Sequence, residues 1–207
     1  MSKIDQLFSE NPHATAFAKG YLEYLGEILA QMDVSAIAGF AEIVLKARER
    51  GARIFFIGNG GSAATASHFA NDFGAGSRSW EKPFRAVSLT DNLATLTAIA
   101  NDYGYDEIFT RQLQMLMLPG DIVVAISASG NSKNVVKAVE YANLNGATTV
   151  VLTGFDGGEL KRIGHLGIHV PTNKGEYGPV EDAHMIIDHM VGAFLMNTCL
   201  QERADKE

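Results

Sequence analysis

Ile54-Phe55-Phe56-Ile57-Gly58-Asn59-Gly60-Gly61-Ser62 is the stretch that decides the fold. Its unbroken apolar run predicts a short strand with both faces covered, which is typical of a parallel sheet sandwiched between helices. The Gly- and Asn-rich residues predict a turn, and the pattern over 62–74 predicts a helix. A strand that leads through a turn into a helix indicates the α/β class.

The same pattern returns further along the chain. Ile122–Ile126 is an apolar run closed by the Ser-rich segment 127–132, and residues 149–152 form a third run. Shorter strands are expected at 85–89 and 166–170. Helices are expected at 91–101, 106–117 and 132–145. This alternation predicts a three-layer α/β/α fold with a doubly wound parallel sheet of about five strands.

Both ends of the chain carry helical patterns. Apolar residues recur every three or four positions over 14–50, which predicts two N-terminal helices that end at Gly51. Residues 180–200 predict a long C-terminal helix that starts after Pro179 and is apolar on most of its circumference. So apolar a helix is expected to pack inside an oligomer. Without a linker or internal repeat, residues 1–207 are expected to form a single domain.

The composition excludes several classes of protein. In 207 residues, 17 Lys and Arg against 24 Asp and Glu give a net charge of −7, with no basic cluster for nucleic acid or an anionic membrane. The single cysteine, Cys199, excludes an intramolecular disulfide. No apolar run reaches the roughly 20 residues of a membrane helix, and the first residues lack a secretion segment. A cytoplasmic protein with small-molecule ligands is expected.

Two loops follow apolar strands and open helices, namely 58–62 and 127–132. At the carboxyl end of a parallel strand, glycines let the backbone approach an anion, and the next helix supplies free N–H groups. Either loop alone is equally well explained as an ordinary turn. Two of them favour a phosphate ligand. Neither matches the dinucleotide or ATP phosphate-loop patterns.

His68 and Asp72 stand four residues apart in the helix after the first loop, so their side chains share one face. That spacing suits two ligands of one metal ion. The alternative, favoured for this pair taken alone, is that His68 packs against the sheet while Asp72 faces solvent.

The final helix carries an unusual set of ionisable residues among its apolar ones. They are Glu181, Asp182, His184, Asp188 and His189. Such groups are costly on a core helix unless they are paired or bind a metal. Helical geometry places Glu181, His184 and Asp188 within about 60° of one another, whereas His189 lies about 80° from Glu181 and roughly 12 Å further along the axis. Spacing alone therefore favours the first three over the pair Glu181 and His189.

Together these motifs resemble the sugar isomerase (SIS) domain, and within it the phosphoheptose isomerases. The resemblance covers nearly the whole chain. It is carried by segments 57–62, 68–70, 98–102, 120–121, 126–132, 152–158 and the closing acidic and histidine-rich helix. It implies an aldose–ketose isomerase that interconverts sedoheptulose 7-phosphate and D-glycero-D-manno-heptose 7-phosphate, for heptose precursor synthesis, and that assembles as a homotetramer.

The resemblance also implies site residues. The substrate-binding set by position is Asn59, Gly60, Gly61, Asp72, Asp91, Asn92, Ser127, Ala128, Ser129, Ser132 and Glu181. The implied zinc ligands are His68, Asp72, Glu181 and His189, with Asp72 as catalytic base and His189 as the partner acid. Asp72 and Glu181 replace a Glu and a Gln of the family pattern, and both remain suitable zinc ligands. In the family pattern His184 is not a ligand, so we expect it to be a structural residue or one that supports the ligands.

Two other kinds of SIS protein are alternatives to the enzyme. A non-catalytic SIS protein that associates with the bacterial replication initiator shares the pattern of Thr90–Asp102, but Asp72 and His189 favour the enzyme. A sugar-phosphate-sensing regulator would carry a DNA-binding module, for which the chain has no room. Within the enzyme hypothesis, the rival to zinc is a metal-free site in which Glu181 or Asp72 is the general base beside a neutral His189.

Overall fold

The computed structural model describes residues 2–10 and 12–205, so positions 1, 11, 206 and 207 of the predicted domain lie outside the described residues. Its centre is a five-stranded sheet in the order β2-β1-β3-β4-β5, with every neighbouring pair parallel. The strands are β1 (Arg53–Gly58), β2 (Arg85–Ser88), β3 (Ile122–Ser127), β4 (Thr148–Thr153) and β5 (Leu166–His169). The predicted α/β fold with a five-stranded parallel sheet is confirmed.

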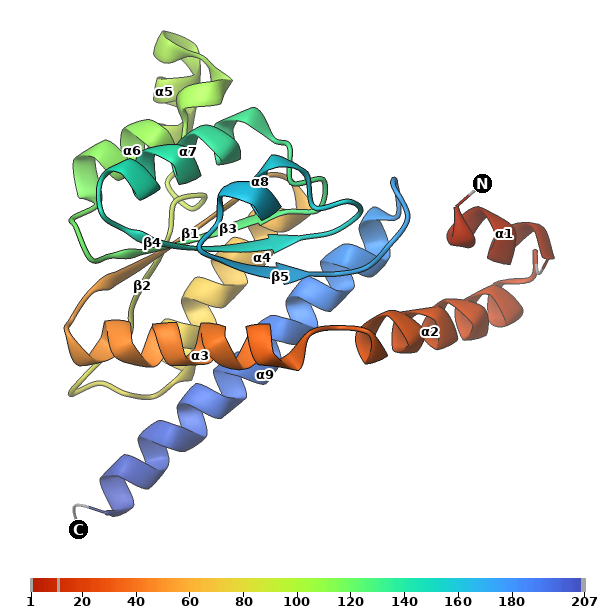
Figure 1. Ribbon diagram of the computed structural model, residues 1–207, viewed down its shortest axis with the longest axis horizontal. Helices are drawn as coiled ribbons and strands as arrows, with labels where there is room; N and C mark the ends of the chain where they lie inside the picture. Colours follow the sequence, from red (N-terminus) through yellow and green to blue (C-terminus); the bar gives the residue numbers. More distant parts are fainter. Residues whose placement is uncertain (1, 11, 206–207) are drawn as a thin grey trace.

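Helices cover both faces of the sheet (Figure 1). On one face lie α3 (Val34–Glu49), α4 (Gly61–Asn71) and α9 (Tyr177–Ala204). The other face is covered by α5 (Leu93–Tyr103), the short η2 (Tyr105–Glu107), α6 (Thr110–Leu116), α7 (Lys133–Leu144) and α8 (Gly158–Ile163). At the N-terminal end, α1 (Lys3–Glu10) and α2 (Ala14–Ala30) project away from the sheet (Figure 1).

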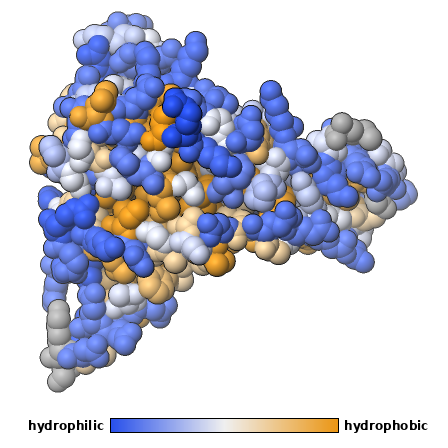
Figure 2. All heavy atoms as spheres, viewed as in Figure 1, coloured by the Kyte–Doolittle hydropathy of each residue, from blue (hydrophilic) through white to orange (hydrophobic). Residues whose placement is uncertain are grey.

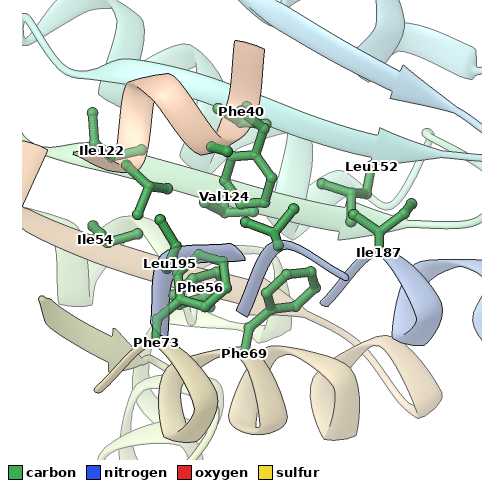
Figure 3. Close-up of a cluster of buried hydrophobic side chains, with 14 of the residues drawn as sticks. Phe40, Ile54, Phe56, Phe69, Phe73, Ile122, Val124, Leu152, Ile187 and Leu195 are labelled. Carbon is green, nitrogen blue, oxygen red and sulfur yellow. The ribbon is translucent and has the colours of Figure 1, made fainter. Parts of the chain in front are cut away.

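The continuous apolar runs produce this layering because successive side chains of a strand point to opposite faces. In β1, Ile54 and Phe56 join the core beneath α3, α4 and α9, whereas Phe55 and Ile57 join the core on the other face. Figure 3 shows the first core, with Phe56 stacked on Phe69 at 5.2 Å between ring centroids. Helix α4 is thereby fixed against the strand that precedes it.

The structure differs from the sequence prediction at several helix ends. The predicted start of the last helix after Pro179 was wrong, since α9 begins at Tyr177. Proline is tolerated in a first turn because its missing N–H would have no partner there. The two helices predicted over 14–50 are confirmed as α2 and α3, but α1 and α8 were not predicted. The helix predicted over 62–74 ends at Asn71 and continues as a π-helical turn, η1 (Asp72–Gly76).

The strand order positions the functional loops. From β1 the chain moves to β2 at one edge, and β3 then pairs with the other side of β1, so that Gly58 is opposite Ile126. The crevice between the carboxyl ends of β1 and β3 is therefore the switch point at which ligands bind in open α/β sheets. The Gly-rich and Ser-rich loops flank this crevice.

An apolar groove lies between α3 and α9, outside the sheet. It is lined by Val34, Ile37, Ala38, Ala41, Glu42, Leu45, Met190, Val191 and Phe194. Figure 2 shows hydrophobic surface gathered over this side of the molecule. Across residues 2–10 and 12–205, no single helix is long and apolar enough to cross a membrane; α2 and α3 pass such a test only as a pair bent by 72°.

Candidate active site

The Gly-rich loop after β1 has a conformation that depends on its glycines. Gly60 has φ +55°, a left-handed value that side chains disfavour. A Cβ at Gly58 would lie 2.5 Å from the Ser62 carbonyl oxygen, so the turn into α4 has no space for one. The tight turn brings the N-terminus of α4 to the crevice, where its free N–H groups favour an anion.

The Ser-rich loop after β3 is equally constrained. Gly130 has φ +65°, and a Cβ there would lie 1.9 Å from the Gly157 carbonyl oxygen. The hydroxyl oxygens of Ser127 and Ser132 lie 3.3 Å apart, and the Ser129 hydroxyl accepts a hydrogen bond from the Asn131 N–H at 3.3 Å. The loop thus presents several hydroxyls over the N-terminus of α7.

These two loops enclose a pocket. It is lined by Asn59, Ser62, Ile126, Ser127, Ala128, Ser129, Ser132, Tyr177 and Glu181. The sequence prediction named six of these residues as substrate-binding, and the structure brings them to one place. The lining contains no Lys or Arg, so hydroxyls and backbone N–H groups are what it offers to an anion.

Asp91 and Asn92 lie at the start of α5. The Ser67 hydroxyl, on α4, donates a hydrogen bond to the Asp91 carboxylate. The Asn92 side chain caps α5 by accepting from the Thr95 N–H at 3.0 Å. Neither residue lines the pocket of the Ser-rich loop. Their assignment to substrate binding stays a prediction.

A second cluster of polar groups lies further along α4 and α9. One ligand atom from each of His68, Asp72, Asp188 and His189 lies within 4.8 Å of the other three. The Nε2 atoms of His68 and His189 are 3.2 Å apart, and His68 Nε2 is 3.5 Å from Asp72 Oδ2. The structure thus gathers three of the four predicted metal ligands, with Asp188 as the fourth member of the group.

Glu181 lies elsewhere, in the pocket between the Gly-rich and Ser-rich loops. A Cβ at Gly61 would be 2.2 Å from its Oε2 atom, so the carboxylate lies directly against the first turn of α4. Burial raises the pKa of Glu181, and the neighbouring Asp182 adds to the shift. A raised pKa suits a group that exchanges protons near neutral pH. Its assignment as a zinc ligand stays a prediction.

Two other ionisable groups of α9 are fully buried. Burial lowers the pKa of His184 to about 4, so this imidazole is neutral at pH 7. Burial raises the pKa of Asp188 to about 8, and the negative charge of Asp72 adds to the shift. Helical spacing grouped these three side chains together, but they have different surroundings. Glu181 lies against the Gly-rich loop, His184 is buried in the core, and Asp188 lies in the histidine cluster.

The cluster has donors suited to a metal. Zinc in catalytic sites takes imidazole nitrogens and carboxylate oxygens, and two nitrogens on one tetrahedral zinc are about 3.3 Å apart. The 3.2 Å between the two Nε2 atoms is close to that spacing. Both Asp188 oxygens are buried without a hydrogen-bond partner. The residues present therefore fit a divalent ion.

Comparison with known proteins agrees with this geometry. The family description "SIS domain" matches residues 20–154. A probable phosphoheptose isomerase of Thermoplasma acidophilum is 38% identical over 178 residues, which cover 86% of this chain and 97% of that one. The phosphoheptose isomerase of Geobacter metallireducens is 43% identical over 155 residues, or 75% and 81% of the two chains.

A solved structure extends the similarity to three dimensions. The phosphoheptose isomerase GmhA from Neisseria gonorrhoeae superposes with a TM-score of 0.76 at 31% identity, over 86% of this chain and 95% of that one. The fold and the two loops thus define a SIS domain. More closely, the chain belongs to the phosphoheptose isomerase family and is an isomerase.

Several residues of the site were not predicted from the sequence. Asp188 was noticed on the final helix, where spacing grouped it with Glu181 and His184, but it was not placed in the ligand set. Tyr177 and Ser62 line the pocket although neither was in the predicted substrate-binding set; Ser62 had been noted only as the end of the Gly-rich loop. Asn134, on α7, accepts a hydrogen bond from Asn59 of the Gly-rich loop, and no sequence pattern indicates such a contact.

Proposed function

We propose that this isomerase converts sedoheptulose 7-phosphate into D-glycero-D-manno-heptose 7-phosphate, a step toward heptose-containing surface glycans. One observation carries the proposal. The pocket between the Gly-rich and Ser-rich loops and the cluster of His68, Asp72, Asp188 and His189 lie along the same two helices. Along the axis of α4, Ser62 and His68 are about 9 Å apart. Along the axis of α9, Glu181 and His189 are about 12 Å apart. An extended sugar phosphate can reach from one to the other.

Phosphate binding is assigned to the two loops. Ser127, Ser129 and Ser132 would donate hydroxyl hydrogen bonds, and the Ala128 backbone would donate its N–H. Asn59, Gly60 and Gly61 would lie beside the sugar. The N-termini of α4 and α7 favour the phosphate dianion without requiring a basic side chain, which is consistent with the acidic composition.

The isomerisation moves a proton between C1 and C2 through an enediolate, so it needs a base for the carbon-bound proton and an acid for the oxygens. Asp72 is assigned as the base and His189 as the acid. Asn71 donates a 2.9 Å hydrogen bond to Asp72 Oδ1, which leaves Oδ2 directed at His68. His189 is exposed and so accessible to substrate.

Zinc is the proposed cofactor, held by His68, Asp72 and His189, which lie in one cluster. Family resemblance implies Glu181 as the fourth ligand, although its carboxylate lies against Gly61 at the Gly-rich loop and not in that cluster. When bound, such an ion stabilises negative charge on substrate oxygens as a Lewis acid. Support comes from the donor types and the spacing of the two Nε2 atoms. The metal-free alternative predicts full activity after chelation.

A direct assay tests the function. Purified protein is incubated with sedoheptulose 7-phosphate, with and without added zinc, and the aldose product is followed by NMR. Asp72→Asn should lower kcat at least about 100-fold, the scale of a lost general base. Asp102→Asn, an exposed control, should leave it unchanged. Absence of turnover in the unmodified protein would favour the non-catalytic binding protein, for which the similar proteins above give no support.

A homotetramer and a cytoplasmic location complete the proposal. The apolar groove between α3 and α9 supports assembly, since Met190 and Phe194 are about half exposed at 49% and 54%. Cys199 is a buried free thiol, as expected in a reducing compartment. No nucleic-acid or membrane partner is proposed.

A further inference from the structure

Asp188 is the least satisfied carboxyl group among the described residues of the site. Its side chain is 0% exposed, and neither oxygen has a hydrogen-bond partner. Its neighbours on α9, Ile187 and Val191, belong to the hydrophobic core. A buried carboxyl without a partner is costly, and native proteins rarely keep one without a ligand or a function for it.

The surroundings of Asp188 show what could satisfy it. His68 Nε2 is 4.0 Å from its Oδ2 atom, and the ligand atoms of Asp72 and His189 complete a group within 4.8 Å. The same His68 nitrogen lies closer to two other atoms, at 3.5 Å from Asp72 Oδ2 and at 3.2 Å from His189 Nε2. A single hydrogen on this nitrogen can point at only one of the three neighbours, so His68 by itself does not satisfy Asp188.

A divalent cation serves all four groups together. Two carboxylates and two neutral imidazoles carry a total charge of −2, which neutralises a 2+ ion. Burial of Asp188 also fixes its position, because its helix is packed on the sheet, whereas Glu181 lies two turns away against Gly61. Asp188 is therefore already at the cluster, and Glu181 is at the phosphate loops.

We propose that Asp188 is a ligand of the metal at this site, completing the set His68, Asp72 and His189, and that Glu181 faces the sugar instead of the metal. This proposal rests on the proposed function, because it concerns the metal of the same site. It assigns Asp188 a role that family resemblance does not, and it releases Glu181 for proton exchange or hydrogen bonding with the substrate.

The test is zinc binding by the full chain, measured by competition with a chromophoric chelator. Unmodified protein should hold one zinc ion per chain. Asp188→Asn should weaken zinc affinity at least 100-fold. Glu181→Ala, which leaves no ligand atom at the rival position, should change it less than threefold. Cobalt substituted for zinc should give a visible spectrum that changes in Asp188→Asn and is unaltered in Glu181→Ala. Equal affinities and spectra in the Asp188→Asn variant and the unmodified protein would overturn the proposal, as would metal loss in Glu181→Ala.

A crystal structure of the unmodified protein with zinc keeps the proposal testable if Asp188→Asn does not fold. An Asp188 oxygen should lie about 2.0–2.2 Å from the ion. A Glu181 oxygen in that position, with Asp188 outside the coordination sphere, would overturn it. Turnover of sedoheptulose 7-phosphate is measured in parallel. Turnover without zinc binding removes the metal proposal alone, whereas zinc bound through Asp188 without turnover removes the proposed function alone.

Discussion

Asn59 and Asn134 exchange two side-chain hydrogen bonds, each 2.9 Å long, across the crevice between β1 and β3. Asn59 belongs to the Gly-rich loop, and Asn134 is buried in the first turn of α7, directly after the Ser-rich loop. The Tyr105 hydroxyl donates a third bond of 2.9 Å to Asn59 Oδ1. These hydrogen bonds fix the position of the Gly-rich loop relative to the Ser-rich loop, the two loops proposed to bind phosphate.

Asn134→Leu should make the position of the Gly-rich loop relative to the Ser-rich loop less fixed. Loss of the reciprocal pair leaves the Asn59 side-chain nitrogen without its acceptor, while Oδ1 keeps the bond from Tyr105. This should lower the free energy of unfolding by about 1–3 kcal/mol and raise KM for the sugar phosphate. Urea denaturation and steady-state kinetics measure the two effects. Tyr105→Phe, which keeps the amide pair, should stay within about 1 kcal/mol of the unmodified protein. An unchanged KM in Asn134→Leu would contradict the positioning role.

Gly61→Ala should displace Glu181. The added methyl would lie 2.2 Å from Glu181 Oε2, and a flexible carboxylate can move aside while the helix stays intact. We expect at least about a tenfold loss in kcat/KM, equivalent to about 1.4 kcal/mol, with a melting temperature close to that of the unmodified protein. Gly26→Ala on α2, where a Cβ meets nothing within 4 Å, is the control. Full activity in Gly61→Ala would show that the position of this carboxylate is unimportant.

Ser129→Ala and Ser132→Ala test the phosphate cradle. Each removes a hydroxyl donor to a charged oxygen, worth roughly 1.5–3 kcal/mol of substrate affinity, or about 10- to 150-fold in Kd. Isothermal titration with the sugar phosphate measures the change. The exposed Ser35→Ala on α3 serves as the control. If both loop variants bind as tightly as the unmodified protein, these serines do not contact the phosphate.

His184 should make the fold acid-sensitive. The unfolded chain takes up a proton near pH 6.5, whereas burial keeps His184 neutral down to about pH 4. The contribution to stability is therefore fully present above pH 6.5 and is lost as the pH falls toward 4, on the order of 3 kcal/mol in total. Urea denaturation of chelator-treated protein across this range should give a shallower pH dependence for His184→Gln. The exposed His13→Gln is the control, and parallel curves for all three proteins would refute the prediction.

Phe194→Asp should disrupt the proposed tetramer. A carboxylate in the groove between α3 and α9 would have to be desolvated on assembly, which is costly without a partner. Light scattering should give a tetramer for the unmodified protein at micromolar concentration and a smaller species for the variant. Leu144→Asp, at a site 86% exposed on α7, should remain tetrameric. A monomeric unmodified protein would end this part of the proposal.

The sequence by itself determined the class of fold and the loops that carry the function. Continuous apolar runs such as Ile54–Ile57 require a strand covered on both faces, and glycines such as Gly60 and Gly130 mark backbone that side chains disfavour. Both signals are local, since they depend on neighbouring residues and on the period of a strand or a helix. Helix ends were less certain, as the start of α9 at Tyr177 shows, because a proline fits either before or inside a first turn.

Only the tertiary structure decided which side chains meet. The pairing of β1 with β3 brings Asn59 to Asn134 across 75 residues of sequence. On α9, spacing grouped Glu181 with Asp188, but the loops lie against one and the histidine cluster against the other. Periodicity gives the direction of a side chain around its own helix axis. What lies in that direction depends on how α4 and the sheet pack against the helix, and that packing is set by contacts between residues far apart in the chain.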